Sequence, residues 1–592
     1  MEIKWGLIDP GTRFFKGKQV PALRDSWKLD AVRNGVVFAA AVIQCSEPAV
    51  ATLGRNLAFD WTGKLPRVRI EARWTDGQGQ PLQQAPGRVS LHWVGYVPDD
   101  NGDLSGDALL TAESLTLEAD FAYAVWVRVE TEKDAAPGVY KLDLNLYVQQ
   151  GWDEEAAAAS VSVAVRVHEV TLPDPRDYTF YLDLWQHHTR WAQYYNVPRW
   201  SERHWRLIEA FAAELAKGGQ KAVTVVASDA PWAGQGCWDV PQEPFAFYEF
   251  NTVGVTRDQD GRLRCDFTVM DRLIETYAAA GIDREIEIIG LLGAWHDAFG
   301  SPLEDYPDPI RIRVYDEATG RYDFIRTKDE LAAYVKQLVD HLKARGWFEK
   351  ARISSDEPAD VERFRTCIEF LRSIEPDLRF KIACNHAEFM DASLDDILDW
   401  VPNLASLTKD AALTRRLTQE IHARGGRMSW YVCLHPEYPN NFLHSPPYET
   451  RLLGWLTDWF GIDGFLRWAY AAWAPDTWTK PAWKFPAGDL YLVYPGTDGA
   501  PLSSVRWEML KLAAQEFELL RTLRRKVDSL ADAGKKEEMQ SRLDALISRV
   551  ILVNDLGEFR VDQKRPGELY ATDPAAYDVV RAEVIRLLTQ LA

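Results

Sequence analysis

The chain has 592 residues, which is too long for one ordinary domain and predicts two or three. Its 68 basic and 88 acidic residues give a formal net charge of −20, which argues against a nucleic-acid or anionic-membrane partner because both need a basic surface. The 24 tryptophans are roughly three times the average usage. They are compatible with a large core but favour a carbohydrate cleft, because a flat indole can stack on a sugar ring.

The six cysteines are scattered, with no CxxC pair and no Cys/His cluster, so neither a disulfide framework nor a zinc site is expected. The first residues lack a basic segment followed by an apolar one, and no apolar run reaches the length of a membrane span. We therefore expect a cytoplasmic location and no membrane insertion. A homo-oligomer is compatible with the sequence, which does not predict how many chains assemble.

Residues 1–172 alternate short apolar runs with Gly, Pro, Asp and Asn turns, which is typical of antiparallel strands. The spacing predicts an N-terminal β-sandwich that supports the rest of the chain, with Leu172-Pro173-Asp174-Pro175 as the linker out of it. The predicted strands are Val36–Gln44, Val68–Trp74, Val89–Tyr96, Tyr123–Glu130, Val139–Val148 and Ser160–Val170.

Residues 173–500 repeat a strand followed by an amphipathic helix, which predicts a multidomain α/β protein with a central (β/α)8 TIM-like barrel. No glycine-rich phosphate-binding turn follows a strand, so nucleotide-binding folds lose support. The predicted strands are Thr179–Leu184, Ala222–Ala227, Ile286–Leu292, Ala351–Ser355, Phe380–Cys384, Leu404–Leu407, Met428–Cys433 and Phe465–Ala471. The predicted helices are Glu202–Lys217, Val269–Ala280, Lys328–Ala344, Val361–Ile374, Ala411–Arg424 and Glu449–Phe460.

Residues 501–592 predict a helical tail that packs on the barrel, after one more extended segment at 489–496. Asp573 and Pro574 suit the N-cap and the first position of the last helix. The predicted helices are Ser504–Lys526, Glu537–Arg549 and Pro574–Leu591.

Two adjacent carboxylates, Asp356 and Glu357, follow an apolar run and precede Pro358. Proline disfavours a helical conformation in the residue before it, so we expect the pair to end a strand. Side chains at the carboxyl ends of barrel strands converge on one cleft, and Asp356 and Glu357 are its predicted catalytic residues. The predicted substrate-binding residues are Asp183, Trp185, His187, His296, Asn385, His386, Trp430, Tyr431, Trp468, Tyr470 and Trp473.

Histidines near these strand ends suggest metal ligands as an alternative. His187, His188, His296 and Asp297 lack the HxH or HExxH spacing of common sites, and each histidine alone is better explained as a hydrogen-bonding wall. We expect neither a metal nor a cofactor.

Glycoside hydrolysis normally needs two carboxyl groups that flank the scissile bond, about 5 Å apart for retention and about 6.5–9.5 Å apart for inversion. Consecutive residues, with Cα atoms about 3.8 Å apart, can hardly flank it. Either Glu437 is the nucleophile, or the substrate supplies one from a 2-acetamido group. In the second case Glu357 is the general acid and then the base, and Asp356 orients the acetamide.

Several stretches of residues 178–520 also resemble glycoside hydrolase family 123 and the related "domain of unknown function 4091" proteins. The resemblance implies a β-sandwich, a TIM barrel and retaining, substrate-assisted β-N-acetylgalactosaminidase activity, with Asp356 and Glu357 as the catalytic pair. The matching stretches are Asp183-Leu184-Trp185-Gln186-His187, Ser355-Asp356-Glu357-Pro358, Trp430-Tyr431-Val432-Cys433, Arg451-Leu452-Leu453-Gly454-Trp455, Gly464-Phe465-Leu466-Arg467-Trp468-Ala469, Leu492-Val493-Tyr494-Pro495-Gly496 and Ser504-Val505-Arg506-Trp507-Glu508.

The leading hypothesis is therefore an exo-glycosidase that acts on terminal β-linked N-acetylgalactosamine in a glycan or glycolipid. One alternative is a retaining glycosidase for a non-acetamido sugar with a separate carboxylate nucleophile. The other is a barrel that binds carbohydrate without catalysis, which the intact acidic pair disfavours because a pure binder needs no general acid.

Overall fold

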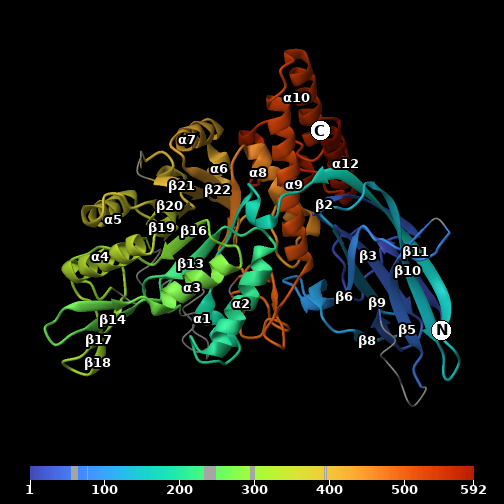
Figure 1. The fold of residues 1–592 in the computed structure, drawn as a ribbon, viewed down its shortest axis with the longest axis horizontal. Coiled ribbons are helices and arrows are strands. Elements are labelled where there is room, and N and C mark those ends of the chain that lie inside the picture. Colours follow the sequence, from blue (N-terminus) through green and yellow to red (C-terminus); the bar gives the residue numbers. More distant parts are fainter. Residues whose placement is uncertain are drawn as a thin grey trace.

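The computed structural model describes residues 1–54, 64–76, 78–232, 249–293, 301–392, 394, 397–483 and 485–591. Sheets from the N-terminal region lie on one side of the molecule and a barrel ringed by helices lies on the other (Figure 1). Long C-terminal helices stand between them. Within the described part of the chain, no helix combines the length and apolarity needed to cross a membrane.

The N-terminal region forms two sheets, and all six strands predicted there are present. The first sheet runs β1 (Ile3–Ile8), β3 (Val36–Cys45), β9 (Ala122–Thr131), β6 (Gly87–Pro98) and β7 (Leu104–Leu110). The second runs β2 (Ser26–Arg33), β11 (Ala156–Thr171), β10 (Gly138–Gln149), β5 (Arg67–Thr75), β4 (Ala49–Leu53) and β8 (Ser114–Leu117). Most pairs are antiparallel as predicted, but β2–β11 and β4–β5 are parallel.

The two sheets share one apolar core, because alternate side chains of their strands point toward each other. Leu142, Leu144 and Leu146 of β10 pack there with residues of the first sheet. The other face of β3 contributes Phe38 and Val42 to a second apolar cluster, beside residues of the C-terminal helix α9 (Val505–Asp528). Both faces of β3 are therefore covered.

Eight strands, all parallel, form one sheet in which the second to the eighth strand lie in chain order and the first lies beside the eighth. Its end strands approach each other through a bridge between Leu182 and Gln220, so the barrel is nearly closed. The strands are β12 (Tyr181–Leu184), β13 (Ala222–Val226), β16 (Glu285–Ile289), β19 (Ala351–Asp356), β20 (Phe380–Cys384), β21 (Ile397–Pro402), β22 (Arg427–Tyr431) and β23 (Gly464–Arg467). The intervening helices are α1 (His188–Tyr194), α2 (Glu202–Ala216), α3 (Thr268–Ala279), α4 (Lys328–Ala344), α5 (Val361–Ile374), α6 (Leu404–Lys409), α7 (Ala411–Ala423) and α8 (Pro447–Phe460).

One predicted barrel strand is wrong. Residues 404–407 begin helix α6, whose N-cap Asn403 accepts a hydrogen bond from the Ser406 amide, and the sixth strand lies earlier, at Ile397–Pro402. That strand carries Asp399, whose charge is satisfied inside the barrel by Arg427 at 3.1 Å. The sixth strand therefore contains a buried charged residue, and the prediction, which looked for an apolar run, did not recognise it.

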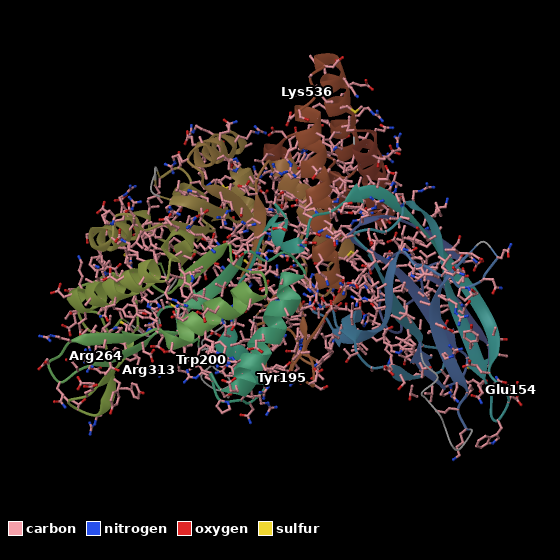
Figure 2. All side chains as sticks on the ribbon, viewed as in Figure 1. Glu154, Tyr195, Trp200, Arg264, Arg313 and Lys536 are labelled. Carbon is pink, nitrogen blue, oxygen red and sulfur yellow. The ribbon has the colours of Figure 1, made fainter. Side chains whose placement is uncertain are left out.

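A small four-stranded sheet, which was not predicted, is inserted after β13 and β16. It contains β15 (Leu263–Asp266), β14 (Gly254–Arg257), β17 (Arg313–Asp316) and β18 (Arg321–Phe324). Arg264 and Arg313 project from it at the edge of the molecule (Figure 2).

The C-terminal residues form the predicted helical region, which consists of α9, α10 (Ala533–Ile547), α11 (Pro566–Leu569) and α12 (Pro574–Gln590). Asp573 is the N-cap of α12 as predicted, and its side chain accepts from the Ala575 amide. The predicted extended segment at 489–496 is mostly irregular, with only β24 (Tyr494–Pro495) paired to β25 (Pro501–Leu502).

Candidate active site

A pocket of about 490 Å³ opens at the carboxyl ends of the barrel strands. Strands β12, β19, β20, β22 and β23, or the loops after them, supply most of its walls. The lining residues are Trp185, Asp356, Glu357, Ala383, Tyr431, Cys433, Leu434, Leu466, Trp468 and Phe485. Both predicted catalytic residues are among them, in a pocket whose other walls are mainly apolar.

The backbone of Glu357 explains how two adjacent carboxylates reach one pocket. Successive side chains of an extended strand point to opposite faces, so a regular strand would send Asp356 and Glu357 apart. Glu357 instead has a φ of 49°, in the left-handed region, which for a non-glycine residue costs on the order of 1–3 kcal/mol. Its amide donates to the Ala383 carbonyl oxygen at 2.8 Å, which ties this turn to β20.

Two polar side chains hold the Glu357 carboxylate. The Tyr431 hydroxyl donates to Oε1, and Asn385 Nδ2 donates to Oε2 at 3.1 Å. Burial raises the pKa of the Tyr431 phenol well above its ordinary range, and the nearby Glu357 charge adds to the shift. Tyr431 therefore stays protonated and remains a donor.

Trp232 holds the other carboxylate. Its indole Nε1 donates to Asp356 Oδ2 at 2.8 Å. The Trp232 ring lies between Trp185 and His187, with ring centroids 6.0 and 4.9 Å away. Burial lowers the pKa of His187 to about 4, so this imidazole is neutral and its Nε2 donates to the Trp468 carbonyl oxygen at 2.8 Å.

Aromatic side chains form another part of the pocket wall. The ring of Phe485 lies 5.1 Å from that of Trp468. The Trp468 indole donates to Asp489 Oδ2 at 3.1 Å, and Arg467 binds the other oxygen of Asp489 at 2.6 Å. These bonds fix the indole, which presents a flat apolar surface of the kind that stacks on sugar rings.

The predicted substrate-binding residues divide into two groups. Trp185, Tyr431 and Trp468 line the pocket, Asn385 contacts Glu357, and His187 lies behind Trp232. Their contact with substrate stays a prediction.

The other group lies away from the pocket walls. Trp430 packs on Phe460 and Phe465 outside the barrel, the Tyr470 ring packs on Phe211 and Trp507, and the Trp473 indole donates to the Val493 carbonyl oxygen. His386 is partly exposed beside Glu388, and Asp183 is buried beneath the pocket. His296 lies outside the described residues.

Two residues that sequence reasoning missed are Trp232 and Phe485. Trp232 follows β13, so the same rule of strand ends, applied to that strand, would have found it. Phe485 sits in the long connection after β23, where no local pattern indicates a wall of the pocket.

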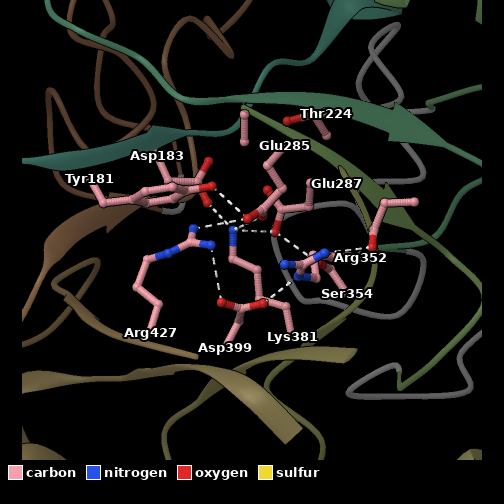
Figure 3. A network of polar contacts seen from close by, with 12 residues as sticks. Tyr181, Asp183, Thr224, Glu285, Glu287, Arg352, Ser354, Lys381, Asp399 and Arg427 are labelled. Atoms are coloured by element: carbon pink, nitrogen blue, oxygen red, sulfur yellow. Dashed lines mark hydrogen bonds and ion pairs between the residues drawn. The ribbon is translucent and has the colours of Figure 1, made fainter. Parts of the chain in front are cut away.

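A buried ionic layer joins side chains of several barrel strands (Figure 3). Its members Asp183 and Lys381 stand two residues before the pocket residues Trp185 and Ala383, so the layer lies beneath the pocket. Oxygens of Asp183, Glu285 and Glu287 all lie within 4.8 Å of one another, a spacing that suits a metal ion. The Lys381 ammonium supplies the positive charge there: it pairs with Asp183 and lies 3.0 Å from Glu285 and 3.1 Å from Glu287. These carboxylates therefore already have a cation.

The layer contains more acids than cations. Asp183, Glu285, Glu287 and Asp399 face Lys381, Arg352 and Arg427 (Figure 3). Burial, with the Asp183 charge adding to it, raises the pKa of Glu287 to about 8. For Glu285 burial acts in the same direction, but Lys381 and Arg427 outweigh it and lower its pKa. Glu287 is therefore the carboxyl that holds a proton.

The family model for the glycoside hydrolase 123 catalytic domain matches residues 185–523, more than half of the chain. The chain belongs to glycoside hydrolase family 123. This family 123 protein is therefore a glycoside hydrolase with a carbohydrate substrate, and the motif resemblance is confirmed. The family model runs into α9, and the predicted domain boundaries at 172 and 500 stay predictions.

Among solved structures, the family 123 chain resembles a family 123 glycoside hydrolase from Clostridium perfringens, described for glycolipid glycan hydrolysis. The identity is 16% and the TM-score 0.75, over 100% of this chain and 98% of that one, which shows a common fold. A β-D-glucuronidase from Dictyoglomus thermophilum (8% identity, 82% and 69% covered, TM-score 0.28) and a mannanase catalytic domain from Streptomyces sp. (14%, 49% and 76%, 0.24) are too dissimilar to inform the site. No curated protein matches the chain.

Proposed function

We propose that this glycoside hydrolase is a retaining exo-enzyme that removes terminal β-linked N-acetylgalactosamine, with the acetamide of the substrate as nucleophile. The observation that carries the proposal is the pairing of Asp356 and Glu357 in one pocket. Among the described residues that line it, these two alone bear carboxylates, and Glu437, the alternative nucleophile, is exposed outside the lining. Two carboxylates on one chain turn suit catalysis in which the substrate supplies the nucleophile.

In the first step Glu357 donates its proton to the glycosidic oxygen while the acetamide carbonyl oxygen attacks the anomeric carbon. The bond to the leaving group breaks and a cyclic oxazolinium forms. Asp356 accepts a hydrogen bond from the acetamide N–H, which orients the group and stabilises its developing positive charge. Asn385 and Tyr431 keep Glu357 in place.

In the second step Glu357 removes a proton from water, which attacks the anomeric carbon and opens the ring. Two displacements on one carbon retain the β configuration. The ionic layer fills the barrel beneath the pocket and so closes the bottom of the pocket. A pocket closed at its bottom suits an enzyme that removes terminal sugars. The layer's members Asp183 and Lys381 lie on β12 and β20, two residues before the pocket residues Trp185 and Ala383.

The sugar is tested by initial rates on matched p-nitrophenyl β-glycosides of N-acetylgalactosamine, N-acetylglucosamine and galactose. We expect the N-acetylgalactoside to be cleaved fastest and the galactoside hardly at all, because galactose has no acetamide. Cleavage of the galactoside at a comparable rate would contradict the proposal.

A further inference from the structure

We propose that Trp232 is a positioning residue that fixes the Asp356 carboxylate for its work on the acetamide. The inference rests on the proposed function, in which Asp356 contacts that group. Indole is a donor only, so the bond of 2.8 Å assigns Asp356 Oδ2 as the acceptor. A hydrogen bond from a neutral donor to a carboxylate favours its charged form, which the oxazolinium step needs.

The residues just before Trp232 are held firmly. Ala230, two residues earlier, has a φ of 49°, and its amide donates to the Glu249 carbonyl oxygen at 2.8 Å. The carboxylate of Asp229 accepts from the Arg313 amide at 3.0 Å, which ties the loop to the inserted sheet. A strained backbone held in place by such contacts is typical of a geometry kept for function.

The surroundings of Trp232 leave its ring little freedom. The side chain is 4% exposed and packs against Trp185 and His187. The imidazole of His187 is neutral because burial lowers its pKa to about 4. The contact that we assign as stabilising Asp356 is therefore the neutral indole N–H of Trp232 rather than a cation. This group does not titrate near neutral pH.

The titratable groups facing Asp356 within the described residues are Glu357, Tyr431 and Cys433 in the pocket, and His187 behind Trp232. Burial raises the pKa of the Tyr431 phenol and of the Cys433 thiol, so both stay protonated. Of these described groups, the two carboxyl groups are the ones left to shape the activity profile near neutral pH.

The test is Trp232→Phe, which keeps an aromatic ring and removes the N–H. We expect kcat on the β-N-acetylgalactosaminide to fall roughly 10- to 100-fold, the loss expected for one hydrogen bond to a charged group. KM should change much less. The acidic limb of the pH–kcat/KM profile should move to higher pH, because the charged form of Asp356 loses a donor.

The matched control is Trp191→Phe, since the buried Trp191 indole donates to the Ala471 carbonyl oxygen at 2.8 Å, outside the pocket lining. This variant loses the same kind of bond, so we expect a lower melting temperature with an unmoved acidic limb. If Trp232→Phe does not fold, Trp232→His keeps a ring N–H and should retain more activity than Trp232→Leu.

A double-mutant cycle shows whether Trp232 acts through Asp356. In an Asp356→Asn background, Trp232→Phe should lower kcat no further. Wild-type kcat together with an unmoved acidic limb in Trp232→Phe would overturn the proposal, as would full additivity in the cycle. Failure of the proposed function looks different: the wild-type enzyme would prefer another β-glycoside, and the same comparison would then be made on that substrate.

Discussion

The left-handed backbone at Glu357 goes with the placement of two sequence neighbours in one pocket, as the proposed catalytic pair requires. With the 49° φ of Glu357, both carboxylates line one pocket, and each is held by its own donors: Trp232 on Asp356, and Tyr431 with Asn385 on Glu357. The two carboxylates to which we assign the general-acid and acetamide-orienting roles are thus separately supported.

Replacing either carboxylate should abolish most of the activity without unfolding the protein. For Glu357→Gln we expect a loss of roughly 10²–10⁴-fold on substrates with poor leaving groups, the usual contribution of general acid–base catalysis. For Asp356→Asn we expect a loss of roughly 10²–10³-fold on all substrates, because charge stabilisation is removed. The measurements are kcat/KM and circular dichroism.

The matched control is Glu437→Gln, which neutralises an exposed carboxylate outside the pocket lining. It should keep wild-type kcat/KM. Loss of activity in Glu437→Gln with normal activity in Asp356→Asn would favour the separate nucleophile instead.

At this scale the sequence predicted the acidic pair but only part of the pocket wall. The rule of strand ends found Asp356, Trp185 and Trp468, because each lies at or just past the end of a strand. The rule cannot tell Trp430 from Tyr431, since neighbours in a strand face opposite sides and the register is not visible in the sequence.

At the scale of elements, the ionic layer joins the strands beneath the pocket. Lys381 on β20 binds Asp183 of β12 and Glu285 and Glu287 of β16. On β19, Ser354 donates to Glu287 Oε1 at 2.9 Å, two residues before Asp356. The layer therefore links the strand that precedes the proposed catalytic pair to the rest of the barrel.

Lys381→Met should destabilise the barrel strongly, because it leaves the buried carboxylates of Asp183 and Glu285 without their shared ammonium. Breaking a buried ion pair by removing one partner lowers the free energy of unfolding by about 3–5 kcal/mol. Urea unfolding measures this loss. The control is Lys336→Met, which removes an exposed lysine paired with Asp340 on α4 and should change stability by less than about 1 kcal/mol. Equal effects of the two substitutions would contradict the role of the layer.

Glu287 should make stability depend on pH. Its pKa rises from 4.5 to about 8 on folding, so its contribution is fully present below 4.5 and is lost as pH rises through about 8. The free energy of unfolding of Glu287→Gln should therefore fall less than that of the wild type between about pH 5 and about pH 9. Parallel pH dependences, measured by urea unfolding, would show that Glu287 does not hold this proton.

Helices with a clear apolar stripe were the most predictable elements, and strands that are very short or contain a buried charge were the least predictable. Helices α4 and α5 begin and end where predicted, because their apolar stripes and N-caps Thr327 and Asp360 are clear in the sequence. Strand β21 was missed because buried Asp399 and terminal Pro402 hide it. The strands of the inserted sheet are too short to give a periodic signal.

At the scale of the whole molecule, α9 joins the N-terminal sheets to the barrel (Figure 1). Arg506 on α9 binds Asp107 of β7 at 3.0 Å, and neither side chain is exposed. Asp107 also accepts from the Tyr494 hydroxyl at 2.8 Å. One buried carboxylate therefore connects the N-terminal region, the loops after the barrel strands and the C-terminal helices.

Asp107→Asn should weaken this junction, because it leaves the Arg506 guanidinium buried without its counter-ion. We expect a loss of about 3–5 kcal/mol in the free energy of unfolding, measured by urea unfolding. Asp103→Asn is the control, since Asp103 pairs with exposed Lys18 at the surface. A loss no larger than that of Asp103→Asn would show that the junction does not depend on this ion pair.

The architecture of the whole molecule was largely readable from the order of elements: strands first, then alternating strands and helices, then helices. The contacts between these parts could not be predicted from the sequence. Contacts such as Asp107–Arg506 join residues that are distant in the sequence and belong to different secondary-structure elements. The sequence shows that such residues are charged but not which partner each of them binds.

The most direct test of the central claim is the rate of hydrolysis of p-nitrophenyl β-N-acetylgalactosaminide with and without the thiazoline analogue of the oxazoline intermediate. If the acetamide is the nucleophile, the wild-type enzyme cleaves this substrate and the thiazoline inhibits it competitively and far more tightly than N-acetylgalactosamine does. Cleavage that is insensitive to the thiazoline would mean that another group attacks the anomeric carbon, and Asp356 would then not be the residue that orients a nucleophilic acetamide.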